Sequence, residues 1–282
     1  MIKAKKQFGQ NFLKDTSVLD KIIKSMPHNN ANALVEIGPG LGDLTQRLLE
    51  VKPLKAYEVD DELSELLKKN FEDAFQTGRL DLQETDVLGA WEEQGSLHVN
   101  SYDLVANLPY YIATTIILNA LKDKKCKSIT VMVQKEVAQK FSANSGDKEF
   151  SSLAILTQTL GTSRLLFDVA AHSFDPPPKV TSSVMQIVKE REFVSEDKNG
   201  VFESFAKYKQ FENYLRQIFK SPRKTAIKNL SGFWDKTFLT TVFESLGLAP
   251  TLRPHQIDTA THHHLFNELT KVIEDDRKDS KQ

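Results

Sequence analysis

Five short apolar runs alternate with segments of helical periodicity between residues 33 and 142. The runs lie at 33–37, 54–59, 79–85, 102–107 and 128–134, and helical segments follow at 43–51, 61–71, 112–121 and 135–142. Runs of this length are typical of buried strands. Because strands that alternate with helices form parallel sheets covered on both faces, the sequence predicts an α/β fold.

The second half of the chain has a different pattern. Two strand candidates, 163–169 and 181–188, are joined by a loop too short for a crossover helix, which predicts an antiparallel pair. The charged stretch around residue 190 lacks periodicity and indicates a linker. Helical patterns follow at 200–220, 222–230, 235–246 and 261–274. We therefore expect one domain over residues 1–190 and a small helical domain over 191–282.

Composition restricts the cellular compartment and the kinds of metal site that the sequence predicts. Cys126 is the single cysteine, so no internal disulfide can form and a cytoplasmic protein is expected. The N-terminus lacks the apolar region of a signal peptide, and no run reaches the roughly 18 apolar residues of a membrane span. No Cys/His cluster has zinc spacing. The run His262–His264 is interpreted as a solvated helix face, and no metal is expected.

Basic residues gather in two places although the net charge is only −1. A local basic patch can bind a phosphate backbone even in a nearly neutral protein. A solvated helix face is the alternative interpretation of either patch. The candidate RNA-binding residues are Lys5 and Lys6 near the N-terminus and Arg216, Lys220, Arg223, Lys224 and Lys228 in a stretch without acids, 213–230.

A glycine-rich turn lies between the first strand candidate and the helix that follows it. Gly38, Gly40 and Gly42 allow a tight turn and close approach of a ligand to the backbone beside a helix N-terminus. A dinucleotide fingerprint requires a third glycine at position 43, where this chain has aspartate. The pattern therefore suits a ligand without a pyrophosphate, and a purely structural turn is the alternative.

Acidic residues close the next two strand candidates. Glu58 lies 20 residues beyond Gly38, where a carboxylate can accept hydrogen bonds from ribose hydroxyls. Asp86 follows the third strand candidate, where an acceptor suits the exocyclic amine of adenine. Either acid alone is usually a solvated strand-end residue. Together with the glycine turn they predict an adenosine ligand without phosphates, which indicates S-adenosylmethionine.

The fourth strand candidate ends in Asn107, Leu108, Pro109 and Tyr110. The Asn107 side-chain oxygen accepts a hydrogen bond but cannot act as a base. Pro109 favours an extended Leu108, whose carbonyl could then face the ligand crevice. Two such acceptors beside an aromatic ring would hold a planar amine and stabilise the positive charge that develops during methyl transfer. A β-to-α turn with a capping asparagine is the alternative.

These motifs resemble those of the ribosomal RNA adenine dimethyltransferases. The sequences GPGLG (38–42), YEVD (57–60) and NLPY (107–110) carry the resemblance, and KKQFGQNFLKD (5–15), FDPPPKVTSSV (174–184) and FKSPRKTAIKNL (219–230) narrow it to the small-subunit branch linked to kasugamycin sensitivity. The resemblance implies a Rossmann-like methyltransferase sheet with a C-terminal helical domain. This chain departs from the family pattern at RPHQI (253–257), where R-A-E-x-L is usual.

The resemblance also implies an activity and its residues. The enzyme would dimethylate the N6 amines of two adjacent adenosines in a hairpin loop near the 3′ end of 16S rRNA, in a 30S precursor and as a monomer. The target base would lie between Tyr110 and Phe174, with its amine held by Asn107 and Leu108. The implied S-adenosylmethionine contacts are Asn11, Leu13, Gly38, Gly40, Glu58, Asp86 and Asn107.

Three other functions are alternatives to this one. A large-subunit rRNA methyltransferase of the macrolide-resistance type usually has N-I-P-[YF] and a different tail, whereas this chain has Leu108. A ribosome-assembly factor that only binds is disfavoured by the intact Asn107 and Tyr110. A nicotinamide-dependent dehydrogenase is disfavoured by Asp43.

Overall fold

The computed structural model describes residues 5, 10–27, 31–195 and 200–279, and it divides into two compact units. The first unit comprises residues 1–139 and 161–190, and the second comprises 140–160 and 191–282. Within the described residues no helix is both long and apolar enough to cross a bilayer.

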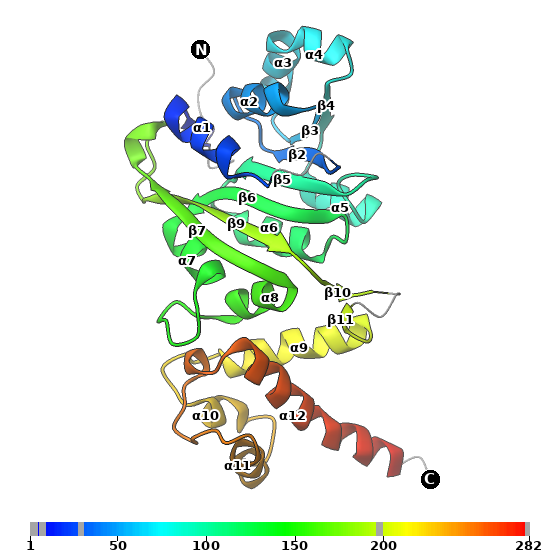
Figure 1. The fold of residues 1–282 in the computed structure, drawn as a ribbon, viewed down its shortest axis with the longest axis vertical. Coiled ribbons are helices and arrows are strands. Elements are labelled where there is room, and N and C mark those ends of the chain that lie inside the picture. Colours follow the sequence, from blue (N-terminus) through cyan, green and yellow to red (C-terminus); the bar gives the residue numbers. More distant parts are fainter. Residues whose placement is uncertain (1–4, 6–9, 28–30, 196–199, 280–282) are drawn as a thin grey trace. The chain divides into compact units, whose positions relative to one another are not determined.

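A seven-stranded sheet forms the centre of the first unit (Figure 1). Its strand order is β4-β3-β2-β5-β6-β9-β7, and β4 to β6 run parallel to one another. The strands are β2 (Ala33–Ile37), β3 (Leu54–Glu58), β4 (Leu80–Glu84), β5 (Tyr102–Asn107), β6 (Cys126–Gln134), β7 (Gly161–Val169) and β9 (Ser182–Lys189). The predicted α/β fold and its parallel strands are therefore confirmed.

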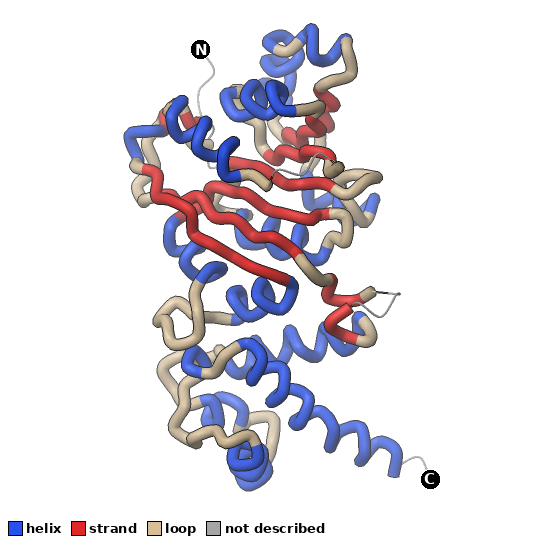
Figure 2. The backbone as a smooth tube through the Cα atoms, in the orientation of Figure 1, coloured by secondary structure: helices blue, strands red, loops and turns tan. Residues whose placement is uncertain are grey.

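The last two strands of this sheet run antiparallel. β9 pairs with both β6 and β7 in the opposite direction, and the three strands lie side by side in Figure 2. This confirms the antiparallel pair predicted from the short connection between 169 and 181. Within that connection lie the short helix η2 (Ala171–Ser173) and β8 (Phe174–Asp175), which pairs with β1 (Phe12–Leu13) near the N-terminus.

Helices cover both faces of the sheet. α1 and α2 lie on one face, and α5 and α6 lie on the other (Figure 1). For α2 and α6 this follows from right-handed crossovers that lead from the middle of the sheet in opposite directions. The helices of this unit are α1 (Thr16–Ser25), α2 (Asp43–Val51), α3 (Asp61–Asn70), α4 (Glu72–Gln76), α5 (Val87–Gln94) and α6 (Ala113–Lys122), and α7 (Lys135–Ser142) spans the boundary of the two units.

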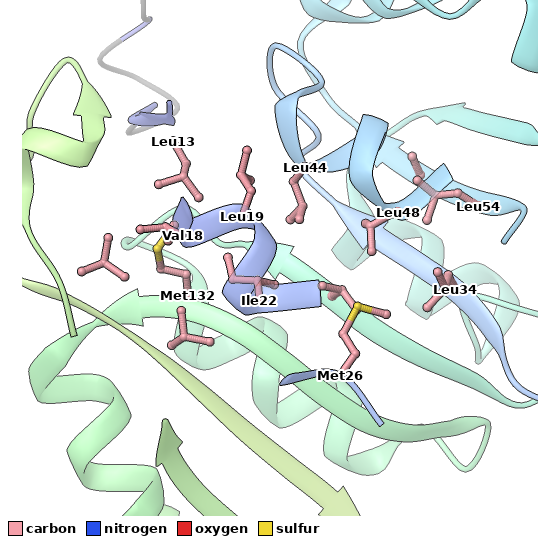
Figure 3. Packing of buried hydrophobic residues seen from close by; sticks show 14 of the residues in the cluster. Leu13, Val18, Leu19, Ile22, Met26, Leu34, Leu44, Leu48, Leu54 and Met132 are labelled. Atoms are coloured by element: carbon pink, nitrogen blue, oxygen red, sulfur yellow. The ribbon is translucent and has the colours of Figure 1, made fainter. Parts of the chain in front are cut away.

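The apolar core of the first unit joins its helices to the sheet. Leu19 and Ile22 of α1 and Leu48 of α2 are each no more than 3% exposed and belong to one cluster with Leu34 of β2 and Met132 of β6 (Figure 3). Burying side chains of this size contributes roughly 1.5–3 kcal/mol each. The cluster fixes α2, and with it the glycine turn that precedes α2, against the carboxyl ends of the strands.

The second unit is mostly helical. Its elements are α8 (Ser152–Leu160), β10 (Glu192–Val194), β11 (Gly200–Phe202), α9 (Phe205–Ile218), α10 (Ala226–Leu230), α11 (Lys236–Ser245), η3 (Pro254–Gln256) and α12 (Thr259–Asp279). The expected linker near residue 190 is wrong in part, because β10 and β11 pair there. Phe193 and Phe202 are both 6% exposed, and the Phe193 ring stacks 4.4 Å from that of Tyr208. Buried aromatic rings thus order a stretch whose charges had indicated a linker.

Candidate active site

A cavity of about 330 Å³ opens at the carboxyl ends of the parallel strands. In open α/β sheets this edge forms the ligand crevice. Ten residues predicted from separate motifs line the cavity together: Asn11, Leu13, Gly38, Gly40, Glu58, Asp86, Asn107, Leu108, Pro109 and Tyr110. The fold therefore brings every predicted cofactor residue, and four of the five predicted catalytic residues, into one place.

Asn107 is held at this cavity by one of its two polar groups. Its Nδ2 donates a hydrogen bond to the backbone carbonyl of Asn11, at 3.0 Å. Because Nδ2 is the donor of this bond, the remaining polar atom of the side chain is Oδ1. Within the described chain, Oδ1 accepts no hydrogen bond. A residue at the end of a strand thereby presents an oriented acceptor that no group among the described residues uses.

The next three residues form the turn that leads into α6. The backbone N–H of Leu108 donates to Met132 at 3.1 Å, and that of Ile112 donates to the Pro109 carbonyl at 3.2 Å. The Leu108 carbonyl receives no hydrogen bond from the described residues. Leu108 thus supplies a second acceptor next to Asn107, as the sequence predicts.

Tyr110 is the fixed aromatic residue of this turn. Its hydroxyl lies 2.6 Å from the Ser182 hydroxyl of β9. Burial of the ring raises the pKa of the Tyr110 hydroxyl above its usual value. The neutral phenol is therefore tethered at its far end, and the ring has one orientation beside the cavity.

Glycine is required at two positions of the turn before α2. Gly40 has φ of +60°, and a Cβ there would lie 3.1 Å from the ring of Phe12. Gly42 has φ of +90°, and a Cβ would lie 2.5 Å from Phe71. These close approaches explain the glycine spacing sterically and place the Phe12 ring over the turn.

Glu58 and Asp86 lie at the ends of neighbouring strands and both also bind backbone. Glu58 is 5% exposed and accepts hydrogen bonds from the N–H groups of Gly40, Val59 and Asp60, at 3.0–3.1 Å. Burial raises its pKa, and those three bonds oppose the rise. They use three of the roughly four acceptor positions of a carboxylate. Asp86 is exposed and caps α5 by accepting from the Leu88 N–H at 3.1 Å.

Glu36 is a cavity residue that sequence reasoning missed. It is 1% exposed in β2, and its Oε2 accepts a hydrogen bond from the Thr45 hydroxyl at 2.7 Å. Burial raises its pKa to about 8, so the carboxyl group is largely protonated near neutral pH. The signal available in the sequence was an acid inside an otherwise apolar strand, two residues before Gly38.

The segment from Gln10 to Leu13 forms one wall of the cavity. Gln10 Nε2 donates to Asp60 at 2.9 Å, and the carbonyl of Asn11 receives the Asn107 amide. Leu13 is 4% exposed and pairs with Phe174 between β1 and β8. The segment is thus joined to three distant parts of the chain, which agrees with its predicted place against a ligand.

Phe174 is the predicted catalytic residue that lies elsewhere. It is 4% exposed, belongs to the core cluster with Leu13, and is absent from the described residues that line the cavity. In this structure the Phe174 ring does not face the cavity, and its predicted contact with a ligand base stays a prediction.

Comparison with known proteins decides the family. A family model described as ribosomal RNA adenine dimethylase matches residues 1–271. The chain belongs to the ribosomal RNA adenine dimethylase family. The predicted resemblance is confirmed. Ribosomal RNA small subunit methyltransferase A of Campylobacter concisus is 51% identical over 271 residues, covering 96% of this chain and 95% of that protein. The protein of that name from Sulfurimonas denitrificans is 52% identical over 265 residues, covering 94% and 93%.

Solved structures of this kind share the fold at lower identity. A dimethyladenosine transferase from Plasmodium falciparum has a TM-score of 0.74 at 24% identity, covering 92% of this chain and 98% of that chain. The 23S rRNA methyltransferase ErmE has a TM-score of 0.70 at 21% identity, covering 92% and 99%. The Rossmann-like methyltransferase fold predicted from the motifs is confirmed, and the relatives above favour the small-subunit branch.

The candidate RNA-binding residues of this dimethylase differ in their surroundings. Lys6 lies outside the described residues. Lys5 is described, and its ammonium group lies 2.8 Å from Asp60 and 3.2 Å from Glu62. The hydrogen bond to Asp60 raises the pKa of Lys5. Lys5 is thus occupied by carboxylates in this structure, and a phosphate would have to compete with them.

The five basic residues of the second unit are all exposed. They lie at the end of α9, in the loop after it and on α10: Arg216, Lys220, Arg223, Lys224 and Lys228. Within the described chain none of them has an ion-pair partner; the Arg216 guanidinium donates to Asn213. Five cations without acids in one stretch remain suited to a phosphate backbone.

The histidine run is not a solvated helix face. His262 is fully buried, and its ring nitrogens lie 2.8 Å from the Tyr214 hydroxyl and 3.1 Å from the Pro254 carbonyl. His263 stacks 4.4 Å from Phe211 and bonds to Thr159 at 2.8 Å, so only His264 is exposed. Burial lowers the pKa of His262 and of His263 to about 4. Among the described residues no group of three or more potential metal ligands is found.

Proposed function

We propose that this chain transfers methyl groups from S-adenosylmethionine to the N6 amines of two adjacent adenosines in a hairpin loop near the 3′ end of 16S rRNA. The substrate would be a 30S precursor in the cytoplasm, and the enzyme would act as a monomer. The observation that carries the proposal is the Asn107 amide, whose Nδ2 is bound by Asn11 while its oxygen has no partner in the described chain.

The cavity fits S-adenosylmethionine. Its volume of about 330 Å³ lies within the range of small-molecule sites, roughly 300–1,000 Å³. Glu58 retains about one acceptor position for a ribose hydroxyl, and Asp86 is exposed for an adenine amine. The turn at Gly38 and Gly40 offers backbone to the ligand, and position 43, where a pyrophosphate-binding turn has its last glycine, is aspartate. When bound, this cofactor would supply an activated methyl group.

The chain's own residues would orient the target amine. For the first transfer to each adenosine, Asn107 Oδ1 and the Leu108 carbonyl would each accept one N–H of the adenine amine. For the second transfer, the methylated nitrogen has one N–H left for one of these oxygens. Two acceptors favour a pyramidal nitrogen and stabilise the positive charge that develops on it, as preorganised dipoles do in other active sites. Neither acceptor takes up a proton at neutral pH, so the proton that the methylated nitrogen loses would pass to water. The role of the two oxygens is orientation and electrostatic stabilisation.

Tyr110 would supply the stacking face for the target base. Its ring is fixed by the hydroxyl contact to Ser182, and base–aromatic stacking contributes roughly 1–3 kcal/mol. Phe174, the other predicted face, would reach the base only after leaving its core position. Hairpin-loop bases are the least costly to turn out of a stack, which suits this substrate.

We further propose that residues 1–190 bind the cofactor and carry out catalysis and that residues 191–282 bind RNA or the ribosome. The support for the second assignment is the exposed basic stretch from Arg216 to Lys228. Contacts to phosphate are salt-dependent because they release counterions. Binding of small subunits should therefore weaken as salt increases, and should weaken further when Arg223 and Lys224 are both replaced by alanine.

A methyl-transfer assay on ribosomal particles tests the proposed function. Labelled S-adenosylmethionine is supplied with unmethylated small subunits or with large-subunit precursors, and the modified nucleotides are mapped. We expect dimethylation of two adjacent adenosines of the small subunit alone. Incorporation only into large-subunit material, or at a site other than an adenine amine, would contradict the proposal.

A further inference from the structure

Tyr111 is an exposed aromatic residue at the mouth of the cavity. It is 61% exposed and yet lines the cavity next to Tyr110. In the described chain its hydroxyl has no hydrogen-bond partner and its ring has no aromatic contact. The support for a contact role is the position of this exposed ring at the cavity, since an aromatic ring offers a large apolar face to a ligand.

The turn fixes where this ring lies. Tyr110 and Tyr111 are the two central residues between Pro109 and Ile112, whose carbonyl and N–H bond at 3.2 Å. The first ring is tethered inward at Ser182, and the second remains in solvent. One turn thus presents an inner aromatic face and an outer one, a single residue apart.

Binding of the proposed substrate would expose a second base that could stack on the outer of these two faces. Turning one adenine out of its stack leaves the neighbouring base without a stacking partner, which costs free energy. The neighbour is joined to the target by one phosphodiester, so it must stay near the mouth of the cavity. A sequence-tolerant aromatic face there would replace the lost stacking.

We propose that Tyr111 is a substrate-positioning residue that stacks on the base adjacent to the adenosine held in the cavity. The inference rests on the proposed function. When one adenosine of the pair occupies the cavity, the adenine joined to it would occupy the Tyr111 face. The chemical class recognised at this face is therefore a purine base, contacted without readout of its hydrogen-bonding edges.

Binding of a synthetic RNA hairpin with two adjacent loop adenosines tests the assignment. Its affinity is compared with those of two hairpins in which one or the other adenosine carries no base. For the wild-type enzyme we expect removal of the neighbouring base to weaken binding about tenfold, the effect of one stacked base. Tyr111→Ala should bind the intact hairpin about tenfold more weakly and lose nothing further when that base is removed.

Matched variants separate stacking from a general defect. Tyr111→Phe keeps the ring and should bind both hairpins as the wild type does. Val99→Ala changes a residue that is 83% exposed, precedes β5 and is absent from the cavity lining, so it should also bind like the wild type. Thermal unfolding of all variants should coincide, because Tyr111 and Val99 are exposed.

The inference is overturned if the affinity lost on removal of the neighbouring base does not depend on the Tyr111 ring. If Tyr111→Ala binds the intact hairpin normally, or if removal of the neighbouring base costs Tyr111→Ala as much as it costs the wild type, Tyr111 does not stack on that base. Mapping of methyl groups on small subunits keeps the two proposals apart. If the wild-type enzyme methylates both adenosines but binds the hairpin equally well without the neighbouring base, this inference alone is refuted. If it methylates neither adenosine, the proposed function is refuted, and this inference with it.

Discussion

The two edges of the central sheet use polar residues in opposite ways. At the amino edge, Asp123 is 4% exposed and accepts hydrogen bonds from Trp91 Nε1, the Leu97 N–H and the Tyr102 hydroxyl, at 2.7–3.3 Å. At the carboxyl edge, Asn107 binds one partner through Nδ2 and keeps an acceptor without a protein partner in the described chain.

The difference separates structural polar groups from functional ones. A buried polar group whose bonding capacity is filled by protein stabilises the fold, and its loss leaves several partners unsatisfied. A positioned polar group with remaining capacity beside a cavity stabilises a ligand or a transition state instead. Sequence chemistry alone does not distinguish the two, because the sequence does not show which hydrogen-bonding positions protein partners already fill.

The largest expected effect is on turnover at the carboxyl edge. Asn107→Ala removes the acceptor oxygen, and loss of one preorganised hydrogen-bonding group typically lowers kcat about 10²–10³-fold. We expect that loss at saturating cofactor, measured by labelled methyl transfer to small subunits. The free energy of unfolding should change by no more than about 1 kcal/mol, because only one neutral hydrogen bond is lost.

Asn107→Asp is the isosteric control for that variant. It keeps an oxygen but cannot donate to the Asn11 carbonyl, so the side chain loses its tether and gains a charge. Near wild-type turnover in either variant would remove Asn107 from the mechanism and erase the difference between the two edges.

The opposite pattern is expected at the amino edge. Asp123→Ala leaves three buried donors without their acceptor, and losses of this kind cost about 3–5 kcal/mol. Urea unfolding should show that loss, whereas kcat per folded molecule should stay within about twofold. Asp123→Asn keeps one acceptor oxygen and should cost less. A large drop in kcat without destabilisation would contradict the structural role.

A pH series tests a further polar group, the buried His262 of the second unit. The pKa of His262 is about 4 when folded, against 6.5 for an ordinary histidine, so the unfolded chain binds more protons between these values. The contribution of His262 to the free energy of unfolding should be fully present above pH 6.5 and should decrease as the pH falls toward 4. The contribution of His262 amounts to about 2 kcal/mol between pH 7.5 and 5.

Urea unfolding of the wild type and of His262→Gln at these two pH values measures that contribution. The glutamine variant lacks the titrating group and should lose less stability on acidification. Equal losses in both proteins would show that His262 is not responsible.

The smallest expected effect is at the glycine turn. Gly38→Ala and Gly40→Ala both place a side chain at positive φ, which costs about 1 kcal/mol. Only at position 40 would the new Cβ meet the Phe12 ring, at 3.1 Å, since at position 38 the nearest atom is 3.9 Å away. Cofactor affinity, measured by calorimetry, should therefore fall more for Gly40→Ala. Equal losses would show that Phe12 does not press on the turn.

Much of the carboxyl edge was predictable because its chemistry lies in contiguous motifs. Asn107, Glu58 and the glycine turn each follow a recognisable strand, so parallel topology was enough to place them together. Their partners were not predictable in this way. The contact of Tyr110 with Ser182 and the bond from Asn107 to Asn11 join residues 72 and 96 positions apart, and only the folded chain shows them.

The failures share a physical cause. The polarity of the histidine run and of the stretch around residue 190 predicts exposure to solvent. Aromatic neighbours instead bury His262, stack on His263 and order β10 and β11. Phe174 was placed by motif resemblance, whereas strand pairing with Leu13 puts its ring in the core. Glu36 was missed because an acid in an apolar strand gives no sign of its protonation until burial is known.

The most direct test of the account is a crystal structure with S-adenosylhomocysteine and an adenosine whose amine enters the cavity. We predict Asn107 Oδ1 and the Leu108 carbonyl oxygen each about 3 Å from the N6 nitrogen, with Asn107 Nδ2 still bound to the Asn11 carbonyl. An adenine amine bound away from these two oxygens, or an Asn107 amide rotated so that nitrogen faces the base, would contradict it.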